Sequence, residues 1–386
     1  MGKNSNSRIN VNSVGLNECT SCGLCAVTCA KKSISIVLND SGFFAPVIDE
    51  TKCNYCGECT SVCYKFHSGD SGNASAYDGK SVIAAIDIDK QELLTVSSGG
   101  VGNRLANHFY DKGYKVCGVV FDPRTDSCKH MIAQTSQDLG RFKTSKYLQS
   151  NTFDAFSTFE KSEKYVVFGT PCQIFGLRKY IQKKKIEERF LLVDFFCRGT
   201  PTLLLWQKYK EYIQRNFGLN NFENVTFRDK SIGWHKFSMR IVDDKGKVYS
   251  RTVYDDLFYS FFLKNTCFTK ACYDCMFRYE EVYSDIRLGD FWGEKYYPHD
   301  EGVSLTILCS EKGKQAWAEI EHLFYAEECL TQDIFKSQRF NKYPIYEKYD
   351  QVMNSLAGDE KLEEIHLALG LDSKVFYKPP ANTVSG

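Results

Sequence analysis

Short apolar runs alternate with amphipathic stretches along much of the chain, and small polar residues separate them. Apolar runs of strand length suit a sheet covered on both faces, and amphipathic stretches suit the helices that cover it. The alternation predicts an α/β sheet from residue 81 onwards. We expect strands at 82–86, 115–121, 165–168, 190–196 and 303–309, and helices at 102–110, 152–161, 173–183, 201–215 and 312–324.

The two ends of the chain depart from this central pattern. Near the start, apolar runs at 33–38 and 43–48 flank the turn residues 39–42, which predicts a β-hairpin. Strands without helices between them are expected at 222–253, and a charged helix near 347–369. The predicted division is an α+β domain at 15–66 after a loosely attached lead, a small polar linker at 67–80, an α/β domain at 81–345, and a C-terminal helix and tail at 346–386.

Composition excludes several classes of partner. The 386 residues carry a formal net charge of +1, so no overall field favours nucleic acid or an anionic membrane. No stretch approaches 18 uncharged apolar residues, so we expect no membrane span. The first residues contain no apolar run of the signal-peptide kind, and we expect a cytoplasmic protein whose 17 cysteines are kept reduced.

Eight cysteines fall in two matching runs, at 19–29 and 53–63. Each run reads C-x2-C-x2-C-x3-C, the spacing of bacterial two-cluster ferredoxins. Three thiolates at this spacing converge on one iron–sulfur cube, and the fourth ligand comes from the other run. The expected ligand sets are Cys19, Cys22, Cys25 and Cys63 for one 4Fe-4S cluster, and Cys53, Cys56, Cys59 and Cys29 for the other.

Two other readings of these runs compete with clusters. A zinc site would more often show separated cysteine pairs and needs no third cysteine in each run. A disulfide framework needs an oxidising compartment, which nothing in the sequence suggests. One departure from the ferredoxin pattern is that Ala30 and Tyr64 replace the proline that usually follows the last cysteine, which removes no ligand.

Four further cysteines lie where an α/β sheet collects ligands. Cys172 and Cys197 each follow an apolar strand, at the strand edge where open sheets bind their ligands. Cys272 and Cys275 form a C-x2-C pair in a polar segment, and the four together equal the ligand number of another cubane. Buried thiols without a metal are the alternative for the first two. Cys267 is an alternative ligand close to the pair.

A glycine-rich turn, Ser97 to Gly102, follows the strand-like segment 93–96 and opens a helix. Small residues at such a point let the backbone approach a phosphate, toward which the helix N–H groups point. The segment matches neither the Walker A pattern nor G-x-G-x-x-G, and an ordinary turn is the alternative.

Four segments in this order resemble the beta-subunit family of deazaflavin-dependent (coenzyme F-420) hydrogenases and dehydrogenases: 169–174, 194–199, 272–275 and 284–293. The resemblance spans about 15–310 and implies a ferredoxin-like N-terminal domain followed by an α/β flavin-binding domain. It implies non-covalent FAD beside a third 4Fe-4S cluster on Cys172, Cys197, Cys272 and Cys275. The residues it implies at the flavin are Ser98, Gly99, Gly100, Lys146, Tyr147, Gln149, Ser150, Thr170, Asp285 and Gly289.

The segments 233–238 and 284–293 look most like bacterial members of this family, which leaves the deazaflavin substrate open. Clusters carry single electrons and a flavin carries two, so we expect an oxidoreductase between ferredoxin or a partner subunit and a small organic acceptor. A relay subunit without its own catalysis, and a structural or sensory protein, are the alternatives. His235 is a candidate proton donor or an ordinary loop residue, and Lys183 to Lys185 either end a helix or dock a ferredoxin.

Overall fold

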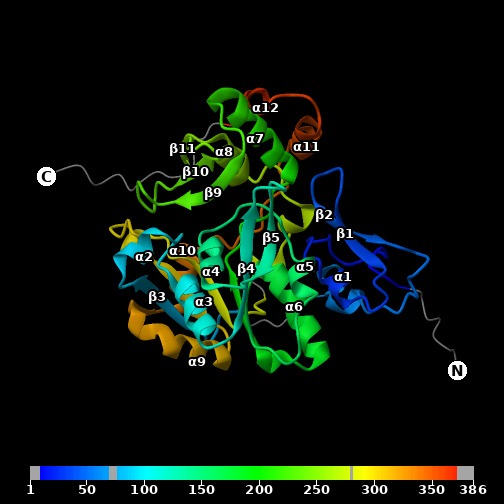
Figure 1. Cartoon of the computed structure of the whole chain (residues 1–386), viewed down its shortest axis with the longest axis vertical. Helices are drawn as coiled ribbons and strands as arrows, with labels where there is room; N and C mark the ends of the chain where they lie inside the picture. Colours follow the sequence, from blue (N-terminus) through cyan, green and yellow to red (C-terminus); the bar gives the residue numbers. More distant parts are fainter. Residues whose placement is uncertain (1–8, 69–75, 279–280, 372–386) are drawn as a thin grey trace.

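The computed structural model describes residues 9–68, 76–278 and 281–371. Figure 1 shows a small N-terminal unit beside a large sheet-based body, with a further helix-and-strand unit at one end of that body. The expected lead and tail lie partly outside the described residues, at 1–8 and 372–386, and so does the middle of the expected linker, at 69–75. None of the described helices is long and apolar enough to cross a bilayer.

The N-terminal unit contains the predicted hairpin. Strands β1 (Ile34–Leu38) and β2 (Phe44–Ile48) pair antiparallel, with Leu38 opposite Phe44 next to the turn. The first cysteine run contains the short helix α1 (Leu24–Thr28). The second run contains the 3-10 turn η1 (Thr60–Val62) and is followed by the 3-10 turn η2 (Tyr64–Phe66). The cysteine runs therefore lie on either side of the hairpin.

The large body is built on a mixed sheet, in which the described residues form nine strands in the order β14-β3-β13-β12-β8-β7-β4-β5-β6. The four central strands β12, β8, β7 and β4 are mutually parallel, and β6 is parallel to β5. The pairs β14–β3, β3–β13, β13–β12 and β4–β5 are antiparallel. Their bounds are β3 (Ser81–Asp87), β4 (Lys115–Asp122), β5 (Ser127–Ile132), β6 (Ser150–Asn151), β7 (Tyr165–Phe168), β8 (Phe190–Phe195), β12 (Ile286–Asp290), β13 (Ser304–Leu308) and β14 (Phe324–Cys329).

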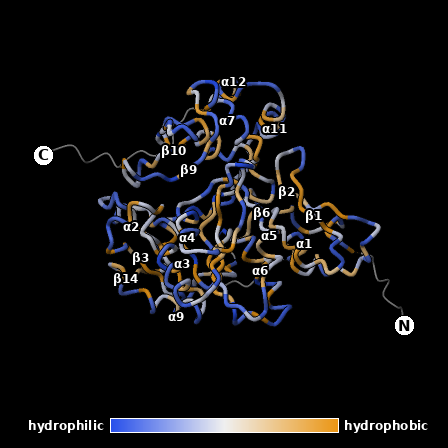
Figure 2. Tube along the Cα trace, viewed as in Figure 1, coloured by the Kyte–Doolittle hydropathy of each residue, from blue (hydrophilic) through white to orange (hydrophobic). Residues whose placement is uncertain are grey.

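Helices cover both faces of this sheet, as its apolar strands require. Successive residues of β7 face opposite layers: Val166 packs with α3 (Val101–Asp111) and α9 (Glu311–Ile320), and Val167 packs with α6 (Pro171–Lys184). The tube in Figure 2 shows hydrophobic stretches recurring in the interior and hydrophilic segments in many outer loops. The remaining helices of the body are α2 (Lys90–Leu94), α4 (Ser136–Phe142), α5 (Phe153–Phe156) and α10 (Thr331–Ser337).

The third unit has an aromatic core around Trp206, which is fully buried. The antiparallel strands β9 (Phe222–Asp229), β10 (Ser238–Asp243) and β11 (Val248–Thr252) pack there with α7 (Leu203–Phe217) and α8 (Leu257–Leu263). The charged helix expected near 347–369 is two helices, α11 (Tyr349–Ala357) and α12 (Leu362–Leu369). Both pack on α7, so the C-terminal segment belongs to this core.

Two other secondary-structure predictions are wrong. The strand-like segment 93–96 belongs partly to α2, because the Asp89 carboxylate accepts hydrogen bonds from the backbone of Gln91 and Glu92 and starts a helix. The helix expected at 152–161 is only the single turn α5, since the hydroxyls of Ser157 and Thr158 bond back to its carbonyls and compete with further helix.

The described ends of the expected linker are anchored to the body. His67 Nε2 lies 2.9 Å from a carboxylate oxygen of Glu281. Tyr77 is fully buried, and its hydroxyl accepts a hydrogen bond from Arg287 Nη1 at 2.8 Å. The contact of His67 therefore ties the N-terminal unit to the body, and Tyr77 already belongs to the core of the body.

Candidate cofactor sites

The two cysteine runs of the N-terminal unit adopt the same backbone turn. Ser21 and Tyr55, each two residues after the first cysteine of its run, have φ of 61° and 56°. Gly23 and Gly57 follow with φ of 78° and 75°, in the left-handed region that glycine adopts without a steric cost. The repeated turn gives the two runs a pseudo-symmetric backbone, in which Cys22, Cys25 and Cys59 are buried and Cys56 is exposed.

The fourth cysteine of each run lies with the other run. Burial is the main cause of the raised pKa of Cys25, and the neighbouring thiols of Cys22, Cys63 and Cys19 add to it. Cys56 and Cys29 contribute in the same way to the raised pKa of Cys59, again after burial. This is the exchange that the ferredoxin spacing predicts. Cys53 is not among these neighbours, and its sulfur accepts from Asn10 Nδ2 at 3.7 Å.

The body brings the other four cysteines together from three separate segments. Cys172 begins α6, Cys197 follows β8, Cys272 ends the turn η4 (Lys270–Cys272), and Cys275 precedes η5 (Met276–Arg278). After burial, Cys197 and Cys275 are the main neighbours that raise the pKa of Cys272, and both also act on Cys172. Cys267 is buried in the aromatic core of the third unit instead.

Two hydrogen bonds point toward sulfurs of this third set. The backbone N–H of Thr200 donates to Cys272 Sγ at 3.4 Å, and the Thr170 hydroxyl lies 3.2 Å from Cys172 Sγ. Burial raises the pKa of the Cys197 thiol to about 11, so its thiolate needs positive charge beside it. Metal binding supplies such charge and releases the proton.

No group of three or more His, Cys, Asp or Glu side chains within the described ranges is arranged to hold a single metal ion. A cubane requires a different arrangement, because each cysteine binds a separate iron and the four sulfurs surround a wider volume. The neighbours and the donor chemistry of the cysteines are therefore the features that bear on cluster binding.

The first N-terminal set lies next to the third set. Cys22 is, after burial, the largest cause of the raised pKa of Cys172. The Thr152 hydroxyl donates to the Cys22 carbonyl at 2.8 Å, and Leu24 is fully buried in one cluster with Ile174 and Leu177 of α6. Lys183, at the end of α6, lies 2.5 Å from the Glu58 carboxylate, so this lysine serves the internal interface.

A cavity of about 720 Å³ opens beside the third set, with Cys197 in its wall. This volume lies within the usual range of small-molecule and cofactor sites. Seven of the ten residues expected at the flavin line it: Ser98, Gly100, Lys146, Tyr147, Ser150, Thr170 and Gly289.

Gly99, Gln149 and Asp285 do not line the cavity, and the expectation for them is not met. A Cβ on Gly99 would lie 2.0 Å from the Ala85 carbonyl oxygen, so this glycine permits close packing on β3. Gln149 Oε1 accepts from the backbone N–H of Phe44 at 2.6 Å, across the interface with the N-terminal unit. Asp285 Oδ2 accepts from Leu192 N at 2.8 Å within the sheet.

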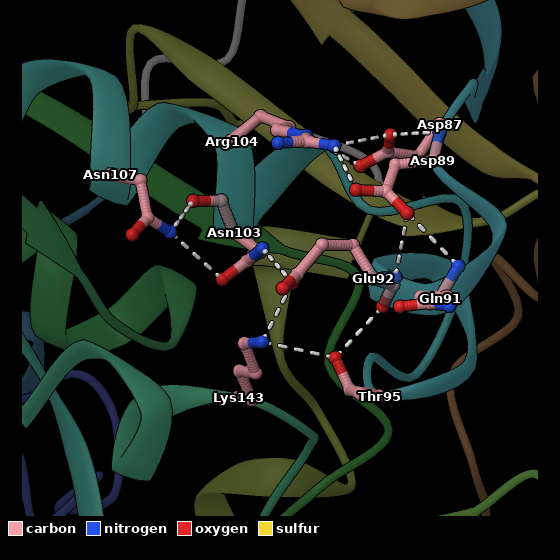
Figure 3. Close-up of polar contacts among 9 residues, drawn as sticks. All are labelled: Asp87, Asp89, Gln91, Glu92, Thr95, Asn103, Arg104, Asn107 and Lys143. Carbon is pink, nitrogen blue, oxygen red and sulfur yellow. Dashed lines mark hydrogen bonds and ion pairs between the residues drawn. The ribbon is translucent and has the colours of Figure 1, made fainter. Parts of the chain in front are cut away.

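A polar network holds the glycine-rich turn in place (Figure 3). Gly100 is the N-cap of α3 with φ of 95°, and no side chain caps this helix start. Arg104 of α3 donates to both carboxylate oxygens of Asp87 at 2.7 and 2.8 Å. Glu92 accepts from Asn103 at 3.1 Å and from Lys143 at 2.7 Å, which ties α2, α3 and the 143–146 loop around the turn.

The cavity carries an excess of positive charge. The basic side chains in its wall are Lys143, Lys146, Arg198, Arg228, Arg278, Lys336 and Arg339, against one acidic side chain, Asp290. Burial lowers the pKa of Lys146 to about 8, and its ammonium donates to three backbone carbonyls. Burial also lowers the pKa of His235, which lines the cavity.

Sequence reasoning missed the arginines of this wall. Arg228 Nη1 donates to Asp290 Oδ2 at 2.8 Å, and its guanidinium carbon lies 4.2 Å from the centre of the Phe237 ring. Arg198 and Asp290 stand inside two of the segments that carried the family resemblance, which was a usable signal for both. Arg228 lies in no such segment, and only folding brings it to the cavity.

Two family matches were found. Residues 162–331 match the C-terminal part of the coenzyme F420 hydrogenase/dehydrogenase beta-subunit family, and residues 18–65 match the family described as "4Fe-4S dicluster domain". No curated protein sequence matches the chain. A chain of the xenon-derivatised F420-reducing nickel–iron hydrogenase complex from Methanosarcina barkeri aligns with a TM-score of 0.45 and 16% identity, over 76% of this chain and 93% of that chain.

Proposed function

Because the chain joins a 4Fe-4S dicluster domain to the C-terminal domain of the coenzyme F420 hydrogenase/dehydrogenase beta-subunit family, we propose that it is an iron–sulfur flavoprotein oxidoreductase. It exchanges single electrons with ferredoxin or a partner subunit, and it reduces a small organic acceptor at FAD. The observation that carries this proposal is the adjacency of three sites: Cys22 lies next to Cys172, and Cys197 of the same set lines the cavity.

The third cysteine set suits a 4Fe-4S cluster. It offers four thiols, and Thr170 and Thr200 make hydrogen bonds with two of the sulfurs. Such bonds hold thiolates in place and tune the potential of a cluster. Together with the two N-terminal sets, the chain has ligands for three clusters.

The cavity suits FAD. The uncapped start of α3 at Gly100, with Lys143 and Lys146 beside it, offers backbone N–H groups and positive charge to a pyrophosphate. Phe196, Leu288 and Trp292 give the wall apolar surface that excludes water from a ring system. When bound, FAD supplies the exchange between one-electron and two-electron chemistry.

The chain's own residues then have distinct roles. Thr152, Leu24 and Lys183 fix the dicluster unit against α6, so that the first and third cysteine sets keep one separation. The network of Figure 3 keeps the glycine-rich turn open toward the cavity. These contacts hold the cysteine sets and the cavity in fixed positions, so that electron transfer between them needs no domain movement.

A second candidate is an oxidoreductase of a deazaflavin coenzyme, which the description of the matched C-terminal family favours. This second function would use the same cysteine sets and the same cavity, and it differs from the first only in the electron acceptor. Screening deazaflavin and other two-electron acceptors against the reduced protein distinguishes the two candidates.

Metal analysis of matched variants tests the proposal. Anaerobically purified protein should hold about twelve iron and twelve sulfide per chain, as three cubanes require, together with FAD. Cys172→Ala should lower the iron to about eight, retain FAD, and remove most ferredoxin-linked turnover. The control Cys329→Ala, at the end of the edge strand β14 and in a hydrophobic cluster that contains none of the twelve cysteines, should keep the full iron content.

Two results would contradict the proposal. A Cys172→Ala protein that keeps about twelve iron and normal ferredoxin-linked turnover would take the third set off the path. Wild-type protein with full iron that binds no FAD would remove the flavin from the cavity.

A further inference from the structure

Three arginines line the cavity wall near the third cysteine set; Arg278 is buried, Arg198 is half-buried and Arg339 is exposed. We call Arg198, Arg278 and Arg339 the arginine group; all three line the cavity. Arg278 Nη2 donates to the carbonyls of Arg198 at 2.7 Å and Cys272 at 2.6 Å. The guanidinium carbons of Arg278 and Arg198 lie 3.8 and 5.4 Å from the centre of the Tyr343 ring.

No carboxylate neutralises this group within the described part of the chain, where none of the three arginines makes an ion pair. Arg278 thereby differs from the other two buried arginines of the described chain, since Arg228 pairs with Asp290 at 2.8 Å and Arg287 pairs with Asp194 at 2.6 Å. Two lysines of the same cavity wall are also paired, Lys143 with Glu92 and Lys336 with Asp333. Lys146 makes no ion pair among the described residues either, but its ammonium donates to three backbone carbonyls. The arginine group therefore gathers three cations of this wall that no described carboxylate neutralises.

Arg278 has an unused donor. Its side chain is nine-tenths buried, with a residue exposure of 6%, and its Nε makes no hydrogen bond to any described residue. A buried charged donor without a partner costs free energy, and such groups in native structures are usually satisfied by a ligand, an ion or water. Planar guanidinium groups bind the paired oxygens of carboxylate and phosphate with particular strength.

We propose that the arginine group binds an oxyanion of the organic acceptor, so that the substrate is a molecule carrying a carboxylate or phosphate. That the anion belongs to an acceptor rests on the proposed function; that an anion binds here rests on the arginines alone. The glycine-rich turn, with Lys143 and Lys146, is left for the cofactor phosphates. The arginine group would hold the acceptor at the part of the cavity where Cys197 lies.

A pair of quinones that differ in charge tests this assignment. The holoprotein is fully reduced, freed of reductant, and mixed anaerobically with 1,4-naphthoquinone-2-sulfonate or with neutral 2-methyl-1,4-naphthoquinone. Flavin absorbance gives the second-order rate of reoxidation, and calorimetry on the oxidised protein gives sulfonate binding without turnover. The variant is Arg339→Gln, because Arg339 makes no hydrogen bond to the third cysteine set within the described residues.

Arg339→Gln should lower both the rate with the sulfonate and its binding constant about tenfold, the effect of losing one charged hydrogen bond. The rate with the neutral quinone should stay within about twofold, and Arg339→Lys should restore part of the sulfonate rate because it retains the charge. The matched control Arg215→Gln removes a partly exposed charge of α7 that pairs with Glu363 and does not line the cavity, and it should change neither rate by more than about twofold.

Equal losses with both quinones would overturn the proposal, since the arginine would then act on the cluster or the flavin. Loss of FAD from Arg339→Gln would also overturn it, because the group would then belong to the cofactor pyrophosphate. If wild-type protein binds no FAD, the proposed function fails, and calorimetry with the sulfonate then decides by itself whether the arginine group binds an anion. A tenfold weaker sulfonate complex in the variant keeps the anion site, and an unchanged complex removes it.

Discussion

The buried pair of Asp194 and Arg287 offers the most direct test of how the body is held together. Both side chains are fully buried, and the arginine donates through Nε and Nη2 to the two carboxylate oxygens at 2.8 and 2.6 Å. Burial lowers the pKa of Arg287, but the attraction of Asp194 outweighs it and holds this pKa well above its ordinary value. Asp194 lies on β8, three residues before Cys197.

Asp194→Asn keeps the size of the side chain and removes its charge. The guanidinium then stays buried without a counter-charge, for which the expected cost is about 3–5 kcal/mol of unfolding free energy. Asp194→Asn with Arg287→Met removes both charges and should be less destabilised than either single variant. Glu327→Gln, in an exposed pair with Lys295, should cost less than about 1 kcal/mol.

Urea unfolding under anaerobic conditions measures these differences. All four tryptophans, Trp206, Trp234, Trp292 and Trp317, lie in the large body or the third unit, so tryptophan emission follows their unfolding and not that of the dicluster unit. The unfolding free energy must fall with urea concentration at the same slope in every variant, because only then do shifts of the unfolding midpoint report changes in stability. A loss below about 1 kcal/mol for Asp194→Asn, or a double variant no more stable than the single ones, would refute this account of the pair.

Two further predictions concern pH and docking. Burial lowers the pKa of His130 to about 4, so between about pH 4 and 6.5 only the unfolded chain takes up this proton. The unfolding free energy should therefore fall as the pH drops through this window, by up to about 1.4 kcal/mol per pH unit. Urea titrations at several pH values should show a flatter dependence of stability on pH for His130→Gln, and an unchanged dependence would contradict this prediction. In Gly176→Val the new side chain meets Leu24, whose Cγ would lie 2.9 Å from the added Cβ. This clash should push the dicluster unit away from α6, so ferredoxin-linked turnover should fall while the reduced flavin still reacts with quinone. Adding Leu24→Ala should restore part of the turnover, and no recovery would argue against a docking effect.

Local patterns predicted much of this fold because their causes lie within a few residues. The alternation of apolar runs and helical stretches identified β3, β4, β7, β8 and β13, and the turn at 39–42 identified the hairpin. Predictions failed where neighbours compete with propensity, as where Asp89 starts α2 and where Ser157 and Thr158 end α5. The antiparallel strands β5 and β14 were missed, since charged and polar residues interrupt their apolar pattern.

Cysteine spacing in the sequence was enough to indicate the dicluster unit, because three of the four ligands of each set lie close together in the chain and the same turn repeats in both runs. Tertiary structure alone brought Cys22 beside Cys172, closed a cavity around Cys197, and left three arginines without carboxylates there. Those features depend on segments that are far apart in the sequence, whose charges and contacts are set by how the chain packs. Gly99, Gln149 and Asp285 show the same limit, since motif membership placed them at the flavin and packing turned each to another partner.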